Sequence, residues 1–145
     1  MKIKPLVKNF ITPTYKTVGS AGMDIYLQSD VELQVGIDNE IHLGFATSVP
    51  EGYVAILVPR SGVGIKGIGL RNTVGVIDSD YRGEWIAHIT IDEQGTNSWG
   101  DQLKYSKGDR LLQCLIVPVN QVTIELVEDL DATERGEGGF GSTGI

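Results

Sequence analysis

The stretch IHLGFATSVPEGYVAILV, residues 41–58, indicates how this chain folds. At its start, Ile41, Leu43 and Phe45 alternate with a histidine and a glycine, which is the pattern of a strand with one buried face. A Pro-Glu-Gly turn follows, and residues 53–58 are then a short, continuous apolar run. Such a run is typical of a strand that is buried on both faces. The stretch therefore predicts two strands joined by a tight turn.

The rest of the chain repeats these two patterns. Alternating apolar residues recur in three further sets, at Val31, Leu33 and Val35, at Ala87, Ile89 and Ile91, and at Val122, Ile124 and Leu126. Residues 111–117 (LLQCLIV) form a second nearly continuous apolar run. No long segment has an apolar stripe of helical period, and we expect only one short helical turn near residues 61–66. The pattern predicts an all-β sandwich or barrel.

Length, charge and cysteine content exclude several classes of protein. The chain has 145 residues, enough for one domain with a core of its own. Its net charge of −7 argues against nonspecific binding to nucleic acid or to an anionic membrane, which needs a basic face. The single cysteine, Cys114, excludes an intrachain disulfide and a multi-cysteine zinc site. With no long apolar run and no signal peptide, we expect a cytoplasmic protein, or one of the host cytoplasm if viral.

Glycines and arginines mark the regions where chemistry is expected. Of the nineteen glycines, four lie within residues 62–69 and five within the last ten residues, which predicts tight turns or close backbone approach there. All five arginines lie in or beside turns rich in Gly or Asp: Arg60, Arg71, Arg82, Arg110 and Arg135. Arginine suits bidentate contact with phosphate or carboxylate. The arginines therefore either build an anion site or brace the loops by pairing with buried carboxylates.

The segment PRSGVGIKG, residues 59–67, contains the spacing G-x-G-x-x-G. It is not a dinucleotide fingerprint, because a turn and a strand follow it instead of a helix. It is not a P-loop either, since Lys66 is followed by glycine. A turn with backbone N–H groups, the hydroxyl of Ser61 and the guanidinium of Arg60 has the parts of an anion cradle. The alternative is a purely structural turn.

The segment NTVGVIDSDYRGE, residues 72–84, combines an amide, carboxylates and a phenol. In a β segment Asp78 and Asp80 share a face, where they can bind a metal or one can act as a general base. The alternative is a structural carboxylate paired with Arg82. A hairpin around Gly75 exposes backbone groups that can read the edge of a base.

The tail RGEGGFGSTG, residues 135–144, brings five glycines together with a guanidinium, two hydroxyls and Phe140. The hydroxyls suit phosphate oxygens, and the aromatic ring suits the face of a base. The alternative is a disordered tail, because residues 134–145 contain too few large apolar side chains to pack alone. For His42 and His88 we expect no catalytic role, and for Cys114 a buried, unreactive thiol.

Five blocks of the sequence together resemble the five ordered motifs of the trimeric dUTPase family (deoxyuridine triphosphate nucleotidohydrolases). They are AGMDI (21–25), PRSGVGIKG, NTVGVIDSDYRGE, GDRLLQ (108–113) and RGEGGFGSTG, in the family's order. The resemblance implies a jelly-roll-like β-barrel or sandwich over residues 1–133. It also implies a homotrimer in which the Gly-rich arm, residues 134–145, is exchanged and closes a neighbouring subunit's active site.

The resemblance also implies roles for individual residues. Asp78 resembles the base that deprotonates the attacking water, and Tyr81 the platform under the deoxyribose that excludes a 2′-hydroxyl. The expected uracil readers are Asn72 and the backbone of Gly75, Val76 and Ile77. The expected α- and β-phosphate binders are Arg60, Ser61, Gly62 and Gln113. The expected arm contacts are Arg135, Gly141, Ser142 and Thr143, with Phe140 as a lid on uracil. Asp24 resembles the carboxylate that holds Mg²⁺ through water, the ion being bound mainly by the substrate triphosphate.

The implied reaction is hydrolysis of dUTP to dUMP and pyrophosphate, which keeps uracil out of DNA and supplies dUMP for thymidylate synthesis. The related dCTP deaminase branch shares the fold and the trimer, but Asp78, Tyr81 and the Phe140 arm favour dUTPase. A second alternative is a β-trimer that binds nucleotide and acts through a protein partner. The long loop at residues 92–106 is the surface expected for that partner. A jelly-roll protein without catalytic activity is disfavoured because every expected functional residue is present.

Overall fold

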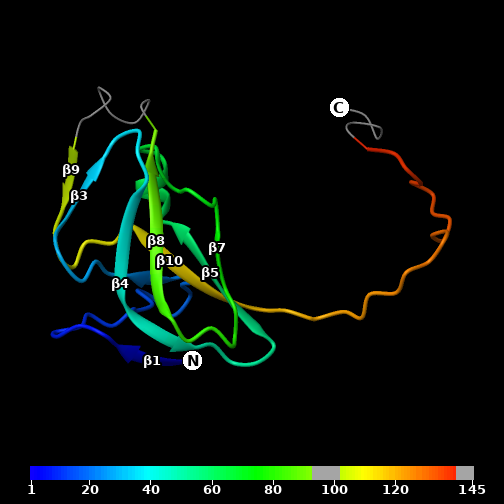
Figure 1. The fold of residues 1–145 in the computed structure, drawn as a ribbon, viewed down its shortest axis with the longest axis horizontal. Coiled ribbons are helices and arrows are strands. Elements are labelled where there is room, and N and C mark those ends of the chain that lie inside the picture. Colours follow the sequence, from blue (N-terminus) through cyan, green and yellow to red (C-terminus); the bar gives the residue numbers. More distant parts are fainter. Residues whose placement is uncertain (93–101, 140–145) are drawn as a thin grey trace.

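The computed structural model describes residues 1–92 and 102–139, and it shows two facing β-sheets with a single helical turn (Figure 1). The strands are β1 (Lys2–Pro5), β2 (Met23–Ile25), β3 (Val31–Gln34), β4 (Asn39–Ser48), β5 (Tyr53–Pro59), β6 (Ile68–Leu70), β7 (Gly75–Ile77), β8 (Glu84–Ile91), β9 (Gln102–Tyr105) and β10 (Leu112–Pro118). The helical turn is α1 (Ser61–Gly64), which follows β5 directly.

All strands pair antiparallel, in two four-stranded sheets and one ribbon. The first sheet has the order β1-β4-β8-β6 and the second the order β2-β10-β5-β7, while β3 and β9 form the ribbon. The second sheet positions most of the predicted functional residues. In it β10 is central, with Gln113 opposite Asp24 of β2 on one side and opposite Val58 of β5 on the other. Strands β2 and β7 are the two edges of this sheet.

The core fills the space between the two sheets. Its largest fully buried side chains include Trp85, Phe45, Leu43 and Leu57. The rings of Phe45 and Trp85 pack with their centroids 5.0 Å apart. The indole N–H of Trp85 donates to the hydroxyl of Thr47 at 3.1 Å, so the buried donor has a partner. Burial of these apolar faces stabilises the sandwich.

Strand β4 is interrupted by a bulge at Gly44, which has a left-handed φ of +74°. The register with β8 shifts there, so that His42 lies opposite Ile86 but Ala46 lies opposite Glu84. The backbone N–H of Gly44 donates to the Glu84 carboxylate at 3.0 Å, which replaces the lost partner in the ladder. The start of β8 is thereby fixed to the middle of β4.

Most strand predictions are confirmed. Alternation correctly placed β3, the first part of β4 and the second part of β8, and the two apolar runs became β5 and β10. The helical turn expected near residues 61–66 is α1. Cys114 is fully buried, and burial raises its thiol pKa to about 12, so the expectation of an unreactive thiol is confirmed.

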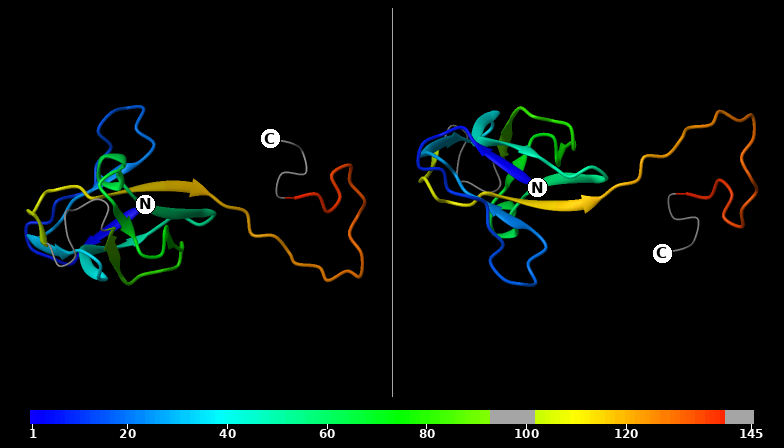
Figure 2. Two further views of the ribbon diagram at one scale, coloured as in Figure 1. Left: turned by 90° about the horizontal axis from the view of Figure 1, so that it is seen from above. Right: turned by 90° about the horizontal axis from the view of Figure 1, so that it is seen from below.

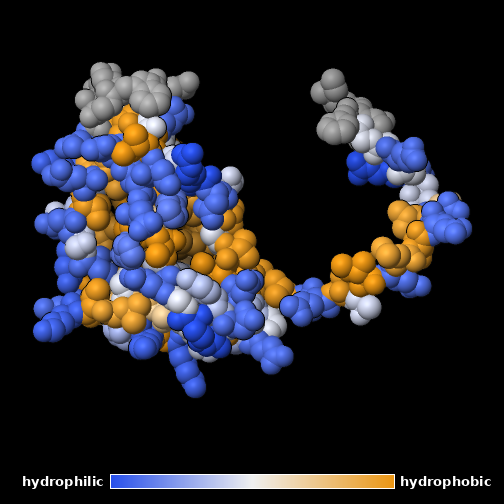
Figure 3. Space-filling view, in the orientation of Figure 1, coloured by the Kyte–Doolittle hydropathy of each residue, from blue (hydrophilic) through white to orange (hydrophobic). Residues whose placement is uncertain are grey.

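Two expectations about the apolar runs are wrong. Residues 122–126 form no strand: Val122, Ile124 and Leu126 are 80%, 84% and 94% exposed. The chain leaves the sheets after Val119, whose N–H donates to the Gly52 carbonyl at 2.8 Å, and the described tail extends outward (Figures 1 and 2). Apolar residues are interspersed with polar ones along that tail (Figure 3). Alternation alone does not make a strand when the chain supplies no sheet edge to receive it.

The second error concerns burial of the outer face of the second sheet. Ala55, Leu57 and Cys114 of β5 and β10 are buried toward the core. The outer face is only partly covered: Val54 is buried, but Ile56 and Leu115 are half-buried. These two lie opposite each other, and Ile56 is also opposite Val76 of β7, which is 61% exposed. Around these three residues the outer face of the sheet is apolar and only partly covered within the single chain.

Within the described ranges 1–92 and 102–139, no helix is long and apolar enough to cross a membrane.

Candidate active site

The first group of predicted site residues gathers around Asp24 in β2. The backbone of Asp24 is held on both sides, by Gln113 of β10 and by a bridge to Thr14. Its side chain is only 8% exposed and binds two guanidinium groups: Arg60 Nε lies 2.9 Å from Oδ1, and Arg110 Nη1 lies 2.9 Å from Oδ2. A carboxylate this buried needs such partners to offset its desolvation.

Arg60, Ser61 and Gly62 follow β5 and begin the α1 turn. The N–H of Arg60 donates to the Leu111 carbonyl at 2.9 Å, and the Gln113 side-chain amide donates to the Pro59 carbonyl at 3.4 Å. The end of β5 and the end of the Asp109–Arg110 turn are therefore tied together. The first N–H groups of a helical turn have no partner inside the turn, so those of Ser61 and Gly62 can meet an anion.

Gly22 makes room for Gln113. A Cβ atom at position 22 would lie 2.7 Å from Gln113 Oε1, closer than real Cβ contacts. We call the set Asp24, Arg60, Arg110 and Gln113 the arginine cluster.

Arg110 is the member of this cluster to which sequence reasoning gave no specific role in the site. The only signal was its place beside the Lys-Gly-Asp turn, which it shared with the other arginines. The expectation that arginines brace loops through buried carboxylates is confirmed for Arg60 and Arg110. For Arg82 it is wrong: its guanidinium donates to the carbonyls of Ser79 and Tyr81, at 2.7 and 2.9 Å, within its own loop.

The second group lies at the other edge of the same sheet, in the segment from Asn72 to Tyr81. A tight turn starts it: Thr73 has a φ of +66°, and the N–H of Val74 donates to the Asn72 carbonyl at 2.7 Å. Gly75 then passes so close to β5 that a Cβ there would lie 2.9 Å from Leu57 Cβ. Glycine is therefore required at position 75 by close packing.

Strand β7 presents an open backbone edge. It pairs with β5 through Gly75, Val76 and Ile77, and it ends the order of its sheet, so no described strand pairs with its other edge. Backbone N–H and C=O groups on such an edge seek partners. A base with alternating donors and acceptors on its edge is a partner of this kind.

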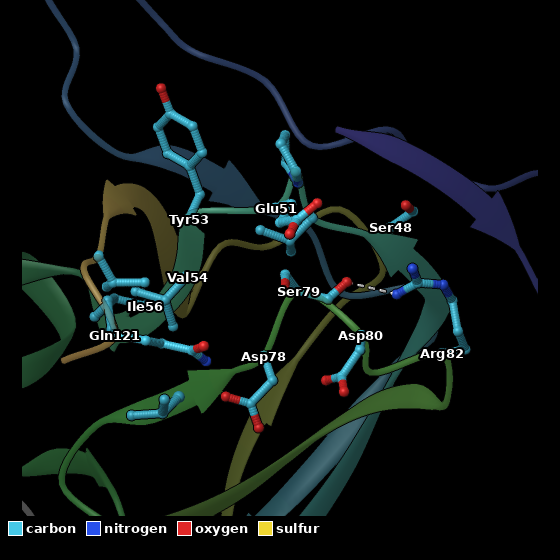
Figure 4. A pocket seen from close by; sticks show the side chains of 14 residues that line it. Ser48, Glu51, Tyr53, Val54, Ile56, Asp78, Ser79, Asp80, Arg82 and Gln121 are labelled. Carbon is cyan, nitrogen blue, oxygen red and sulfur yellow. Dashed lines mark hydrogen bonds between the residues drawn. The ribbon is translucent and has the colours of Figure 1, made fainter. Parts of the chain in front are cut away.

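Asp78 follows β7 and lines two cavities. The larger, of about 910 Å³, also contains Asp80, Arg82 and Tyr53 (Figure 4). Both aspartates are exposed, and in Figure 4 their carboxylates point away from Arg82. The smaller cavity, of about 210 Å³, contains Asp78 and Tyr81 together.

The structure keeps these two groups apart. Asp24 is opposite Gln113 of β10, which is in turn opposite Val58 of β5. At the other edge, Ile77 of β7 is opposite Ala55 of β5, and Asp78 comes one residue later. Three strand spacings and four residues along the strand separate the two backbones by roughly 20 Å. Within one chain, therefore, the predicted phosphate binders do not meet the predicted base.

Arg135, the described member of the predicted arm contacts, belongs to neither group. Arg135 is exposed and donates from Nε to the Gly138 carbonyl at 2.8 Å, on the outward tail. The predicted contacts Phe140, Gly141, Ser142 and Thr143, and residues 93–101 of the predicted partner loop, lie outside the described residues. Of that loop the structure describes strand β9, which pairs with β3.

The two histidines lie on the outer face of β4 and β8 among carboxylates. His42 Nδ1 is 2.9 Å from Glu84 Oε2, and its Nε2 is 3.1 Å from Glu40 Oε1. The hydrogen bond and charge of Glu84, followed by those of Glu40, raise the pKa of His42 above its usual value. His88 pairs in the same way with Asp38 at 2.9 Å. These contacts fit a role on the surface of the fold.

Comparison with known proteins then identifies the family. The dUTPase family model matches residues 8–144, nearly the whole chain. The chain belongs to the dUTPase family.

Individual members are similar over almost their full lengths. The deoxyuridine 5′-triphosphate nucleotidohydrolase of Gamma-proteobacterium EBAC31A08 is 44% identical over 137 residues, 92% of this chain and 94% of that protein. The enzyme of the same name from Shigella sonnei is 45% identical and covers 94% of this chain and 89% of its own length.

Solved structures of family members share the fold. The dUTPase of Staphylococcus bacteriophage 80alpha, solved with the analogue dUpNHpp, superimposes with a TM-score of 0.82 at 30% identity, covering 99% of this chain and 98% of its own. The fold is accordingly the jelly-roll-like β fold of dUTPases, as expected. The dUTPase of phage phi11 of S. aureus, with a TM-score of 0.76 at 28% identity, covers 88% of this chain and 96% of its own. It contains a structural Mg(II) ion.

The described residues fit a magnesium ion that is bound through water, and they do not form a site of direct protein ligands. Across residues 1–92 and 102–139, no three His, Cys, Asp or Glu side chains gather where they can hold a metal ion. Each oxygen of Asp24 has one arginine partner, which leaves lone pairs for a metal-bound water. Magnesium characteristically keeps several waters and binds substrate phosphates. The site therefore fits an ion carried by a polyphosphate, with Asp24 as its outer partner.

Proposed function

We propose that this protein hydrolyses dUTP to dUMP and pyrophosphate, keeps uracil out of DNA and supplies dUMP for thymidylate synthesis. The observation that carries the proposal is the division of one sheet into two kinds of site. An open backbone edge at β7 suits a base, and the arginine cluster suits phosphates. Membership of the dUTPase family supports the same substrate.

The active site is completed by a second copy of the chain. The roughly 20 Å between Asp24 and Asp78 is too long for one nucleotide, whose α- and β-phosphates are joined by a single oxygen. If the cluster of one copy faces the β7 edge of another, both groups reach the same substrate. The partly covered apolar face at Ile56, Val76 and Leu115 supports such an association. A homotrimer, as the motifs imply, repeats this contact three times.

The tail supports exchange between copies. Its apolar residues Val122, Ile124 and Leu126 alternate like a strand but have no sheet to join in their own chain. An edge strand of a neighbouring copy can accept them. The arm with Phe140 and Arg135 then closes over the neighbour's nucleotide, and Ser142 and Thr143 contact its γ-phosphate together with Gly141. The proposed barrel domain then comprises residues 1–133, with the outward residues 120–133 joining the barrel of a neighbouring copy.

Each group has a defined part in the chemistry. The backbone of Gly75 to Ile77, with Asn72, reads the uracil edge, and a rigid hairpin leaves no room for a 5-methyl group. Asp78 orients a water and takes its proton as that water attacks the α-phosphate. Arg60, Ser61, Gly62 and Gln113 hold the α- and β-phosphates. Magnesium, when bound, neutralises charge on the phosphates, and Asp24 holds a water of its shell.

The proposal is tested by a pyrophosphate assay on the purified protein with dUTP and Mg²⁺, run beside dTTP, dCTP and UTP. Pyrophosphate from dUTP alone is expected. Asp78→Asn should abolish it, while the matched variant Asp80→Asn, two residues away in the same cavity, should keep it. Ammonia from dCTP would instead identify the deaminase branch. No turnover of any nucleotide would overturn the enzymatic proposal and point to the loop at residues 92–106 as a surface for a protein partner.

A further inference from the structure

The ring of Tyr81 is seated directly on Gly83. A Cβ atom at position 83 would lie 2.6 Å from Tyr81 Cζ and 3.0 Å from Cε2, and it would also collide with the hydroxyl. Gly83 is not among the glycines with a left-handed backbone. Its conformation is open to other residues, so what a side chain at position 83 would have to displace is the end of the tyrosine ring.

The hydroxyl of Tyr81 is hydrogen-bonded to Glu84, the residue that follows Gly83. It donates to the Glu84 carbonyl at 3.0 Å. Glu84 is itself fixed, because its carboxylate accepts the Gly44 N–H at 3.0 Å and lies 2.9 Å from His42 Nδ1. The ring therefore rests on a segment that is anchored to the bulge of β4.

The rest of the ring is open. Tyr81 is 44% exposed and lines the cavity of about 210 Å³ that also contains Ile77 and Asp78. One side of the ring is thus seated on backbone, while the ring also borders the cavity that holds the proposed base. The contact with Gly83 and the hydrogen bond to Glu84 thus hold the ring at the edge of that cavity.

We propose that Gly83 is a specificity-determining positioning residue that acts through Tyr81. This inference rests on the proposed function and on the role that the motif resemblance implies for Tyr81, the exclusion of a 2′-hydroxyl. Packing alone rejects one extra hydroxyl by roughly 10²-fold at most. A Tyr81 ring that can shift slightly therefore loses much of the selectivity for dUTP over UTP. A side chain at position 83 lifts the ring, breaks its bond to the Glu84 carbonyl and makes room for a ribose.

The experiment compares kcat/KM for dUTP and UTP in the full-length protein and in Gly83→Ala, with the melting temperature measured for both. The matched control is Gly69→Ala in β6, where an added Cβ meets nothing within 4 Å. We expect Gly83→Ala to stay folded and its dUTP/UTP ratio to fall roughly tenfold, whereas Gly69→Ala keeps the ratio. Tyr81→Phe removes the hydroxyl tether but keeps the ring, so its ratio should fall less.

A folded Gly83→Ala protein with an unchanged ratio would overturn the inference. If Gly83→Ala does not fold, Tyr81→Phe is the deciding variant. A lowered dUTP/UTP ratio supports the positioning of the Tyr81 ring, and an unchanged ratio contradicts it. Activity of the wild-type protein distinguishes failure of the proposed function from failure of the role of Gly83. Failure of the wild-type protein to hydrolyse dUTP overturns the proposed function and this inference with it, whereas normal dUTP turnover with an unaltered variant ratio overturns the role of Gly83 alone.

Discussion

The arginine cluster and the β7 edge occupy opposite edges of one sheet, and they are built in opposite ways. The cluster is defined by side chains, with a buried carboxylate between two guanidiniums at 2.9 Å each. The β7 edge is defined by backbone, with glycine packed against Leu57 and an edge that no described strand covers. Charge on phosphates is offset by charged side chains, whereas the shape of a base is read by a rigid main chain.

This difference also determines what each region tolerates. Removing one member of a buried ion pair leaves an uncompensated charge. Adding a methyl group beside a strand instead forces the packing to shift. The variants below use these two kinds of change to separate the regions.

The largest effect is expected from Asp24→Ala. The change leaves the guanidiniums of Arg60 and Arg110, each about one-third exposed, without their shared partner. Because these arginines are partly solvated, we expect a loss of roughly 3 kcal/mol in the free energy of unfolding, measured by chemical denaturation at fixed protein concentration. The control Asp80→Ala removes an exposed carboxylate and should change stability little. Equal stability of the two variants would show that the cluster is not held by its charges.

A smaller effect is expected from Gly75→Ala. The new Cβ would lie 2.9 Å from Leu57 Cβ, an atom that cannot move without the β5 backbone. We expect a loss of about 1–3 kcal/mol in unfolding free energy and a raised KM for dUTP, because β7 is displaced. Gly69→Ala is again the matched control, since its surroundings are open. A variant as stable as the wild type would mean that the β7 edge is not rigid.

Gly22→Ala sharpens the comparison because its crowded neighbour belongs to the arginine cluster. The new Cβ meets the end of the Gln113 side chain, which can rotate away. We expect stability to change by less than about 1 kcal/mol. The KM for dUTP should rise with little change in kcat, since Gln113 then loses its position toward the phosphates. A loss of stability as large as that of Gly75→Ala would contradict the distinction between side-chain and backbone construction.

The smallest effect concerns the exposed ion pairs of β4 and β8, which belong to neither region. The pKa of His42 is raised in the folded protein, first of all by Glu84. The stability that this pair contributes is therefore fully present below the unfolded value of about 6.5 and is lost as the pH rises through the folded pKa. By NMR titration, Glu84→Gln should lower the His42 pKa more than Glu40→Gln does. The opposite order would contradict the assignment of Glu84 as the main cause.

Much of the fold was predictable from short-range patterns. Alternation at Ile41, Leu43 and Phe45 located β4, because a half-buried strand imposes a period of two on its own sequence. The same rule failed at residues 122–126, because pairing depends on an edge that lies outside the sequence window. The apolar run of β5 predicted burial of both faces, but one chain covers the outer face only in part.

The site was predictable in its parts but not in its arrangement. The motif around Asp78 indicated a general base and a hairpin that reads the edge of a nucleobase, because those residue types stand close together in the chain. The role of Arg110 was missed, because its partner Asp24 is 86 residues away and only the pairing of β2 with β10 brings them together. The seat of Tyr81 on Gly83 was missed as well, since a glycine's neighbour in space leaves no mark in the sequence.

The central claim is that each active site combines Asp78 from one copy with the arginine cluster of another. Mixing two inactive proteins, Asp78→Asn and Arg60→Ala, tests it directly after dissociation and reassembly in equal amounts. The whole reassembled mixture, in which native mass spectrometry verifies assemblies of three 15.7 kDa chains, should recover about a quarter of wild-type dUTP hydrolysis. Random assembly gives that fraction of sites with both intact halves. Mixed oligomers with no activity above the two parents would show that the site lies within one chain, and would contradict the account.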